Sequence, residues 1–215
     1  MTDIATEERM NKTSKLLVFG DSWPAGAEVF DKTKTFPNVL GQLLNTQIID
    51  LSREGSSIDE AVFYFLQHFE NTQDTSDCKV LFCLTAPERT MMLPDGESIQ
   101  QLHPNKQSAH SATYYKYFYS EDMVEYNLIR NMLLIQTFCE LNKIPLYFVF
   151  NWDHAPRHKL IDPSKIYSKS LINIIGMDND KDLADQFKTN EYVGKCHPNI
   201  QGHNLIAEEL AKWIN

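Results

Sequence analysis

The chain has 215 residues, of which 42% are hydrophobic and 23% charged, and we expect one folded domain over residues 15–215. Its formal net charge of -9 argues against nucleic acid or an anionic membrane as a main partner, because phosphate contacts need clustered lysine and arginine. No apolar run approaches the roughly 18 residues of a membrane span, and the polar tail 1–14 has no hydrophobic signal core, so secretion by a signal peptide is not expected.

Continuous apolar runs predict strands that are buried on both faces, at residues 15–20, 46–51, 79–85 and 144–150, with a short fifth strand at 171–175. Amphipathic helices are predicted between them, over residues 36–45, from the capping box Ser57-x-x-Glu60, over 120–142, and from Asn199 onward. This alternation indicates an α/β domain in which helices cover both faces of a five-stranded parallel sheet.

Two connections, 86–119 and 151–170, are longer than this fold needs, and loops of such length are functional or disordered. The first carries five aromatic residues close together: Tyr114, Tyr115, Tyr117, Phe118 and Tyr119. They fit a loop that packs on itself and equally a lid that lines a substrate pocket.

Two short motifs at opposite ends of the chain offer a nucleophile and a base. Gly20-Asp21-Ser22 follows the first strand, where an α/β sheet presents its carboxyl edge, and His197-Pro198-Asn199 opens the last helix. A serine hydroxyl is a poor nucleophile until a neighbouring base takes its proton. Taken singly, Ser22 fits a turn or helix-cap residue, and His197 fits a histidine with a structural role. Together, in this order and after a buried strand, the two residues favour catalysis.

These blocks, with the extended match His197-Pro198-Asn199-x-x-Gly202-His203 and a glycine after the second strand at Gly55, resemble the SGNH, or GDSL, hydrolase family. The resemblance implies a flavodoxin-like, three-layer α/β/α sandwich, with Ser22 as nucleophile and His197 as base. It also implies that the backbone N–H groups of Ser22 and Gly55 stabilise the tetrahedral oxyanion. The stretch Thr85-x-Pro87-Glu88-Arg89 resembles a phage-associated branch of this family.

The sequence departs from the family pattern after the third strand, where the family has an asparagine that completes the oxyanion hole. No asparagine follows that strand here, and the loss of one such donor costs about 3 to 4 kcal/mol of transition-state stabilisation. Thr85, Arg89 and Asn151 are the candidate substitutes. Arg89 fits an anion-binding role and equally a structural ion pair with Glu88 or another carboxylate.

The second departure concerns the acid that orients the histidine. The family places an aspartate three residues before it, and that position is Gly194 here. Asp153, just beyond the fourth strand, is the best replacement carboxylate, but a Ser-His dyad without an acid is the preferred arrangement, because a backbone carbonyl can also fix the tautomer. Cys196 beside His197 raises a third alternative, a thiol enzyme.

We therefore predict a serine esterase that acts on a small ester or an acylated carbohydrate, without cofactor. A metal site is not expected, because Asp153, His154 and His158 match no helical ligand spacing, and no phosphate or dinucleotide fingerprint is present. Because the sequence has no hydrophobic signal core and resembles a phage-associated branch, we expect a cytoplasmic or virion-associated location. The alternative is a catalytically impaired binding or virion structural module of the same fold; the oligomeric state stays open.

Overall fold

The structure is a computed structural model that describes residues 14–72, 75, 77–93, 98–105, 108–154, 156, 158–178 and 180–215. The predicted polar tail, residues 1–14, lies outside the described residues except for Ser14. Within the described part of the chain, no helix has the length and apolar character needed to cross a membrane.

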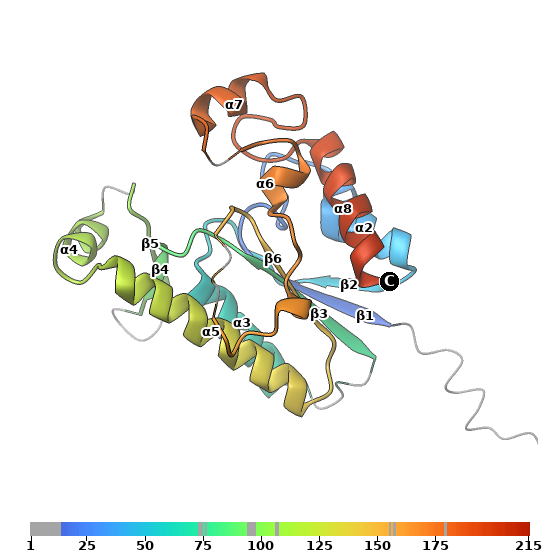
Figure 1. The fold of residues 1–215 in the computed structure, drawn as a ribbon, viewed down its shortest axis with the longest axis horizontal. Helices are drawn as coiled ribbons and strands as arrows, with labels where there is room; N and C mark the ends of the chain where they lie inside the picture. The colour runs from blue at the N-terminus through green and yellow to red at the C-terminus, as the bar shows by residue number, and fades with distance from the viewer. Residues whose placement is uncertain are drawn as a thin grey trace, which may run out of the picture.

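A four-stranded parallel sheet forms the centre of the molecule (Figure 1). Its strands are β1 (Lys15–Phe19), β2 (Gln47–Asp50), β3 (Cys78–Leu84) and β6 (Leu146–Phe150), in the order β2-β1-β3-β6. All three strand pairs are parallel. This is the flavodoxin-like order, and the predicted α/β class with a parallel sheet is confirmed.

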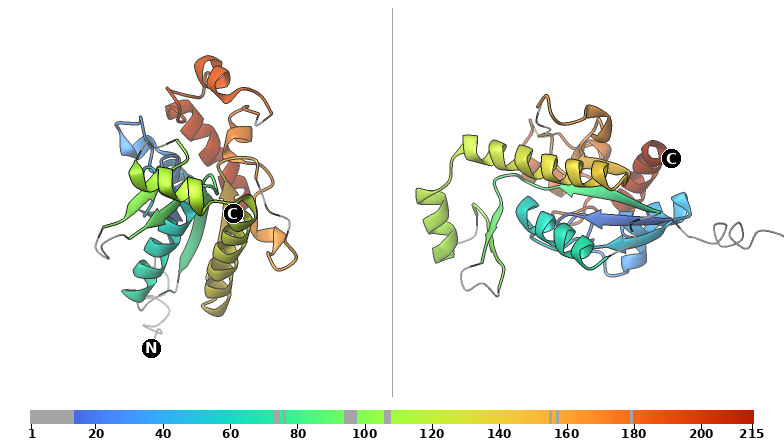
Figure 2. Two further views of the ribbon diagram at one scale, coloured as in Figure 1. Left: turned by 90° about the vertical axis from the view of Figure 1, so that its left-hand side faces the viewer. Right: turned by 90° about the horizontal axis from the view of Figure 1, so that it is seen from below.

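Helices cover both faces of the sheet, so that the architecture is a three-layer α/β/α sandwich (Figures 1 and 2). On one face α3 (Ile58–Glu70) and α5 (Glu121–Leu141) bury a core around Phe19, Phe65 and Phe82. On the other face α2 (Phe36–Leu44) and α8 (Ile200–Ile214) bury a second core around the alternate residues of the same strands. The continuous apolar runs are explained by this double burial, because each strand faces a core on both sides.

The predicted helix starts at Ser57, Ser120 and Asn199 are observed. Each side chain accepts a hydrogen bond from a backbone N–H in the first turn, which satisfies a donor that the helix itself leaves free. The cap of Asn199 is important for the site, because it fixes the start of α8 directly after His197.

The predicted fifth strand is wrong. Residues Leu171–Ile174 form a single-turn helix, α6, which Ser170 caps by accepting from the backbone N–H of Asn173. The run buries its isoleucines beside α8 without pairing in the sheet. Among the described residues, the sheet is extended beside β6 only by an isolated parallel bridge between Ile166 and Phe148.

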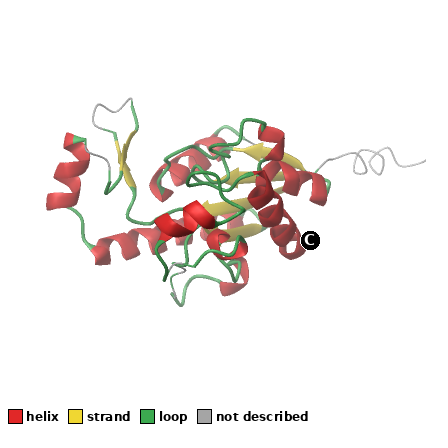
Figure 3. Cartoon of the chain, turned by 90° about the horizontal axis from the view of Figure 1, so that it is seen from above, coloured by secondary structure: helices red, strands yellow, loops and turns green. Residues whose placement is uncertain are grey.

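The two long connections contain structure of their own. The first holds an antiparallel pair, β4 (Thr90–Met92) and β5 (Gln100–Leu102), followed by α4 (Ala109–Tyr117), and these elements project from one end of the sandwich (Figure 3). The second contains the short 3-10 helix η2 (Pro163–Lys165). The remaining elements are η1 (Lys32–Lys34) and α7 (Leu183–Thr189).

Candidate active site

Ser22 lies in a tight turn at the carboxyl end of β1, as the motif predicts. Gly20 is needed there, because a Cβ at this position would stand 2.7 Å from a side-chain carbon of Pro24 and 2.8 Å from the Cβ of Cys83. The turn is closed by a hydrogen bond of 2.9 Å from the N–H of Ala27 to the carbonyl of Ser22. The serine is thereby held at the edge of the sheet rather than packed into a helix.

His197 meets Ser22 across 175 residues of sequence, with 3.0 Å between Nε2 of the ring and Oγ of the serine. The histidine belongs to the loop that precedes α8. Its carbonyl accepts a hydrogen bond of 2.8 Å from the N–H of Gly194, which closes that loop. The two residues that the sequence singled out are therefore within hydrogen-bond reach of each other, the geometry that a nucleophile and its base require.

Glu28 occupies the other side of the imidazole, with 2.8 Å between Oε1 and Nδ1 of His197. Partial burial acts to raise the pKa of Glu28. The hydrogen bonds from His197, from the Lys195 N–H and from Cys196 outweigh it and lower the pKa to about 2. An ionised carboxylate only accepts hydrogen bonds, so the Nδ1 atom carries the ring proton and Nε2 is free to accept one from Ser22.

Sequence reasoning missed Glu28: it preferred a Ser-His dyad without an acid and named Asp153 as the best replacement carboxylate. Asp153 lies on the exposed loop after β6 and lines a cleft, whereas the Nδ1 atom of His197 meets Glu28, so neither Asp153 nor an acid-free dyad describes the geometry. Glu28 sits in an irregular loop with a left-handed φ of 69°, a conformation that non-glycine residues rarely adopt. The one available signal was indirect: Gly194 indicated that the family's usual acid was absent.

The candidate oxyanion donors converge on the buried carboxylate of Asp21. It accepts from Thr85 Oγ1 at 2.6 Å, from Asn151 Nδ2 at 2.7 Å and from Arg89 Nη1 at 3.0 Å. The hydroxyl proton of Thr85 is thus directed at Asp21 rather than at the space above Ser22. Arg89 keeps further N–H groups, and its side chain is 22% exposed, so among the three it is best placed to reach a bound anion.

Gly55 adopts a left-handed φ of 77° in the loop after β2. A Cβ at this position would stand 2.6 Å from Oε1 of Gln101, so a larger residue would have to displace that side chain of β5. The carbonyl of Gly55 lies 2.9 Å from Nε2 of His103. The same loop is tied to the serine motif by a hydrogen bond of 3.0 Å from the Arg53 N–H to the carbonyl of Gly20.

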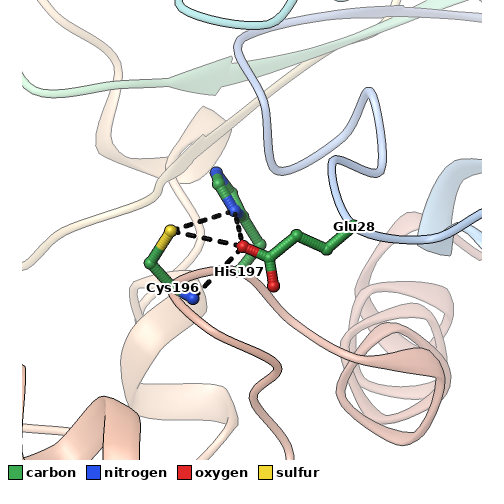
Figure 4. Close-up of side chains that lie close together, drawn as sticks. All are labelled: Glu28, Cys196 and His197. Carbon is green, nitrogen blue, oxygen red and sulfur yellow. Dashed lines mark hydrogen bonds and ion pairs between the residues drawn. The ribbon is translucent and has the colours of Figure 1, made fainter.

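Cys196 touches the same groups from outside. Its Sγ atom lies 3.3 Å from Nδ1 of His197 and 3.3 Å from Oε1 of Glu28 (Figure 4). Burial, followed by the hydrogen bond to Glu28, raises the pKa of the thiol. A raised pKa disfavours the thiolate that a cysteine nucleophile needs, and Nε2 faces Ser22 instead.

An open cleft of about 1860 Å³ adjoins this site. Ser22 and His197 are not among its lining residues. Two residues that do line the cleft contact the serine turn: Arg89 donates a hydrogen bond to Asp21, and the ring centroids of Trp152 and Trp23 lie 5.8 Å apart. Tyr119, from the aromatic group that the sequence pointed out, also lines the cleft, whereas Tyr117 and Phe118 are 66% and 68% exposed. The connection 86–119 therefore contributes to the cleft through one aromatic residue and leaves others in solvent.

No protein-family model matches the sequence, and no curated protein matches it either. Solved structures do match. A psychrotrophic esterase, EstA, from Pseudoalteromonas sp. superposes with a TM-score of 0.52 at 14% identity, covering 94% of this chain and 96% of the other. A member of the lipolytic G-D-S-L family from Veillonella parvula gives a TM-score of 0.53 at 12% identity, covering 93% and 97%. A putative lipolytic G-D-S-L protein from Desulfitobacterium hafniense gives 0.50 at 12% identity, covering 94% and 99%.

These matches extend over nearly the full length of both chains, so the likeness concerns the whole sandwich and not one motif. At such low identity they establish the fold, and the chain has the fold of the G-D-S-L lipolytic esterases.

Proposed function

We propose that this chain is a serine esterase of the SGNH, or GDSL, hydrolase family that cleaves carboxylic esters with Ser22, His197 and Glu28. The observation that carries the proposal is the continuous line of contacts from Ser22 Oγ to His197 Nε2 and from His197 Nδ1 to the Glu28 carboxylate. Nucleophile, base and orienting acid are the three roles that acyl transfer needs.

In the proposed reaction, Ser22 Oγ attacks the ester carbonyl while His197 Nε2 takes the hydroxyl proton. The doubly protonated imidazole is stabilised by the Glu28 carboxylate. It then returns the proton to the alcohol oxygen as the bond between that oxygen and the acyl carbon breaks. Water attacks the remaining acyl-serine with its proton passing to His197, and that proton goes back to Ser22 as the carboxylic acid leaves.

The negative oxygen of the tetrahedral intermediate needs hydrogen-bond donors that are already in place. We assign this role to the backbone N–H groups of Ser22 and Gly55. Arg89 is the third donor in this proposal, because Thr85 and Asn151 each direct a donor at Asp21. Asp21 then holds Arg89 beside the serine turn through their ion pair of 3.0 Å.

The substrate in this proposal is a small ester or an acylated carbohydrate. The adjoining cleft supports a polar ligand, because aromatic rings such as Tyr119, Trp152 and Tyr167 line it together with carboxylates and Arg89. The stretch Thr85-x-Pro87-Glu88-Arg89 supports a phage-associated branch, with a cytoplasmic or virion-associated location. The alternative, a binding or virion structural module, is motivated by two departures from the family pattern: the missing aspartate at position 194 and the missing asparagine after the third strand. The Glu28 carboxylate compensates for the first departure only.

The test is the hydrolysis of p-nitrophenyl acetate by the full chain and by Ser22→Ala, together with labelling by a fluorophosphonate and peptide mapping. We expect the label on Ser22 and the loss of nearly all turnover in Ser22→Ala. Equal rates for the two proteins, with Ser22 unlabelled, would contradict the proposal and favour the binding module.

A further inference from the structure

Three potential metal ligands of different chemistry meet at the outer side of His197. They are Oε1 of Glu28, Sγ of Cys196 and Nδ1 of His197, and these atoms all lie within 4.8 Å of one another (Figure 4). The loop before α8 supplies the cysteine and the histidine, and the turn after β1 supplies the glutamate. Glu28 and Cys196 are exposed, so an ion in solvent has access to the group.

The spacing of these atoms is close to that of a tetrahedral zinc site. With bonds of about 2.3 Å to sulfur and about 2.0–2.1 Å to nitrogen and oxygen, tetrahedral angles place ligand atoms roughly 3.3–3.6 Å apart. Cys196 Sγ lies 3.3 Å from each of the other two ligand atoms, within about 0.3 Å of the upper end of this range, which applies to the pairs that include sulfur. The third separation, 2.8 Å between Nδ1 and Oε1, has to widen by about 0.5 Å for both atoms to bind one tetrahedral ion.

We propose that Zn²⁺ binds to Glu28, Cys196 and His197 and switches the esterase off. Thiolate, imidazole and carboxylate together match zinc better than magnesium or calcium, which prefer oxygen ligands alone. Three protein ligands leave a fourth position for water. The inhibitory part rests on the proposed function, because it requires His197 to be the base; the binding part does not.

Zinc inhibits because a neutral imidazole carries one ring proton, so only one of the two nitrogens of His197 has a free lone pair at a time. In the active arrangement the ring proton is on Nδ1 and points at Glu28, which leaves the Nε2 lone pair for the proton of Ser22. Zinc needs the Nδ1 lone pair, so the ring proton moves to Nε2, and Nε2 has no lone pair left to accept a proton. The Cys196 thiol loses its proton to solvent as the zinc–sulfur bond forms, so one proton is released for each ion bound.

Binding is tested on the metal-free full chain by calorimetric titration with zinc chloride, and with cobalt chloride as a probe whose absorption reports a thiolate ligand. We expect one ion per chain and a thiolate-to-cobalt band. In Cys196→Ser the band is expected to be lost and the zinc affinity to fall by at least about tenfold, since even partners outside the ligand set typically change affinity by about 10- to 100-fold. His110→Ala, on the exposed surface of α4, is the matched control and should bind zinc as the unmodified chain does. Equal zinc affinities for the unmodified chain and Cys196→Ser would overturn the site.

Measuring ester hydrolysis in the presence of zinc distinguishes zinc binding from zinc inhibition. We expect zinc to abolish the hydrolysis of p-nitrophenyl acetate in the unmodified chain and EDTA to restore it. Cys196→Ser should need at least about tenfold more zinc for the same inhibition. Activity that persists while zinc occupies the site would overturn the inhibitory part. Ser22→Ala should still bind zinc, so a chain that binds zinc through Cys196 but never hydrolyses an ester contradicts the proposed function and leaves the metal site standing.

Discussion

The carboxylate of Glu28 lies in the space that a side chain at Gly194 would need, because a Cβ at position 194 would stand 2.5 Å from Oε2 of Glu28. Position 194 is where the SGNH pattern has its aspartate, three residues before the histidine. Here the carboxylate reaches Nδ1 of His197 from a different segment, the turn after β1, and the glycine leaves room for it. The two positions are therefore complementary: Glu28 places a carboxylate beside Nδ1 of His197 from another segment of the chain, in the space that a side chain at position 194 would otherwise occupy.

Glu28→Gln should lower kcat for p-nitrophenyl acetate strongly. The amide presents either a donor or an acceptor to Nδ1, so it no longer enforces the tautomer that leaves Nε2 free, and the loss of a triad acid costs about 10⁴-fold in turnover. The assay contains EDTA, so that metal binding does not contribute. Asp153→Asn removes the best replacement carboxylate that the sequence offered. It should retain kcat within about threefold, or about 0.6 kcal/mol, because Glu28 and not Asp153 meets Nδ1 of His197. A large loss in Asp153→Asn with full activity in Glu28→Gln would reverse the assignment.

Moving the acid to the family's position should restore part of the lost activity. In Glu28→Ala the side chain that obstructs position 194 is gone, and the next atom near a Cβ there is the carbonyl oxygen of His197 at 3.7 Å. Gly194 does not adopt a left-handed φ, so the backbone accepts an aspartate. We expect the double variant Glu28→Ala, Gly194→Asp to exceed Glu28→Ala by about tenfold or more in kcat, which is about 1.4 kcal/mol.

The control for this relocation is Gly194→Asn in the Glu28→Ala background, because asparagine has nearly the same shape as aspartate but no charge. Gly194→Asp in the otherwise unmodified chain should lose activity, because the new side chain collides with Glu28. Equal rescue by asparagine and aspartate would show that space filling, and not the carboxylate, explains the effect.

Elements with continuous apolar patterns were predictable from the sequence, whereas the acid of the site was not. The four sheet strands and the caps at Ser57, Ser120 and Asn199 follow from burial on two faces and from local hydrogen bonding. The approach of Ser22 to His197 follows from motifs at fixed places in a sheet. Glu28 belongs to an irregular turn whose path depends on tertiary contacts with residues 195–197, and no local pattern encodes that path.

The wrong prediction of a fifth strand came from a short apolar run. Residues 171–175 consist almost entirely of isoleucine and leucine, and such a run fits a buried strand and a buried helical turn equally well. The side-chain cap of Ser170 favours the helix. At the edge of the sheet, Ile166 instead pairs with Phe148 of β6 in an isolated bridge. Likewise, the length of 86–119 indicated a functional connection, but the projecting β4–β5 pair and α4 have little hydrophobic periodicity by which to predict them.

Asp21→Ala should destabilise the fold as well as the site. The Asp21 side chain is 2% exposed and is the shared acceptor for Thr85, Arg89 and Asn151. Its removal leaves a guanidinium and two neutral donors without their partner, and breaking such a pair costs about 3–5 kcal/mol. We expect the free energy of unfolding in urea to fall by about 3 kcal/mol, which lowers Tm by roughly 6–12 °C for a chain of this size.

The matched control is Asp180→Ala, which removes an exposed carboxylate and should change the free energy of unfolding by no more than about 0.5 kcal/mol. A stability of Asp21→Ala within that same range would mean that Asp21 does not brace the serine turn.

His203 should make the fold sensitive to acid. It is fully buried, and Nδ1 of its ring accepts a hydrogen bond of 3.0 Å from the Phe36 N–H. Burial is the main cause that lowers the pKa of His203 to about 4, followed by the charges of Lys32 and His197. The unfolded chain binds this proton near pH 6.5. The neutral His203 therefore contributes fully to the free energy of unfolding above that pH, and this contribution, on the order of 3 kcal/mol, is lost as the pH falls toward 4.

Urea unfolding of the unmodified chain and of His203→Gln between pH 7 and pH 4.5 measures this pH dependence. The variant should be less stable at pH 7 but should lose less stability on acidification. The exposed His110→Gln should keep the slope of the unmodified chain, and an equally steep slope in His203→Gln would assign the acid sensitivity to other groups.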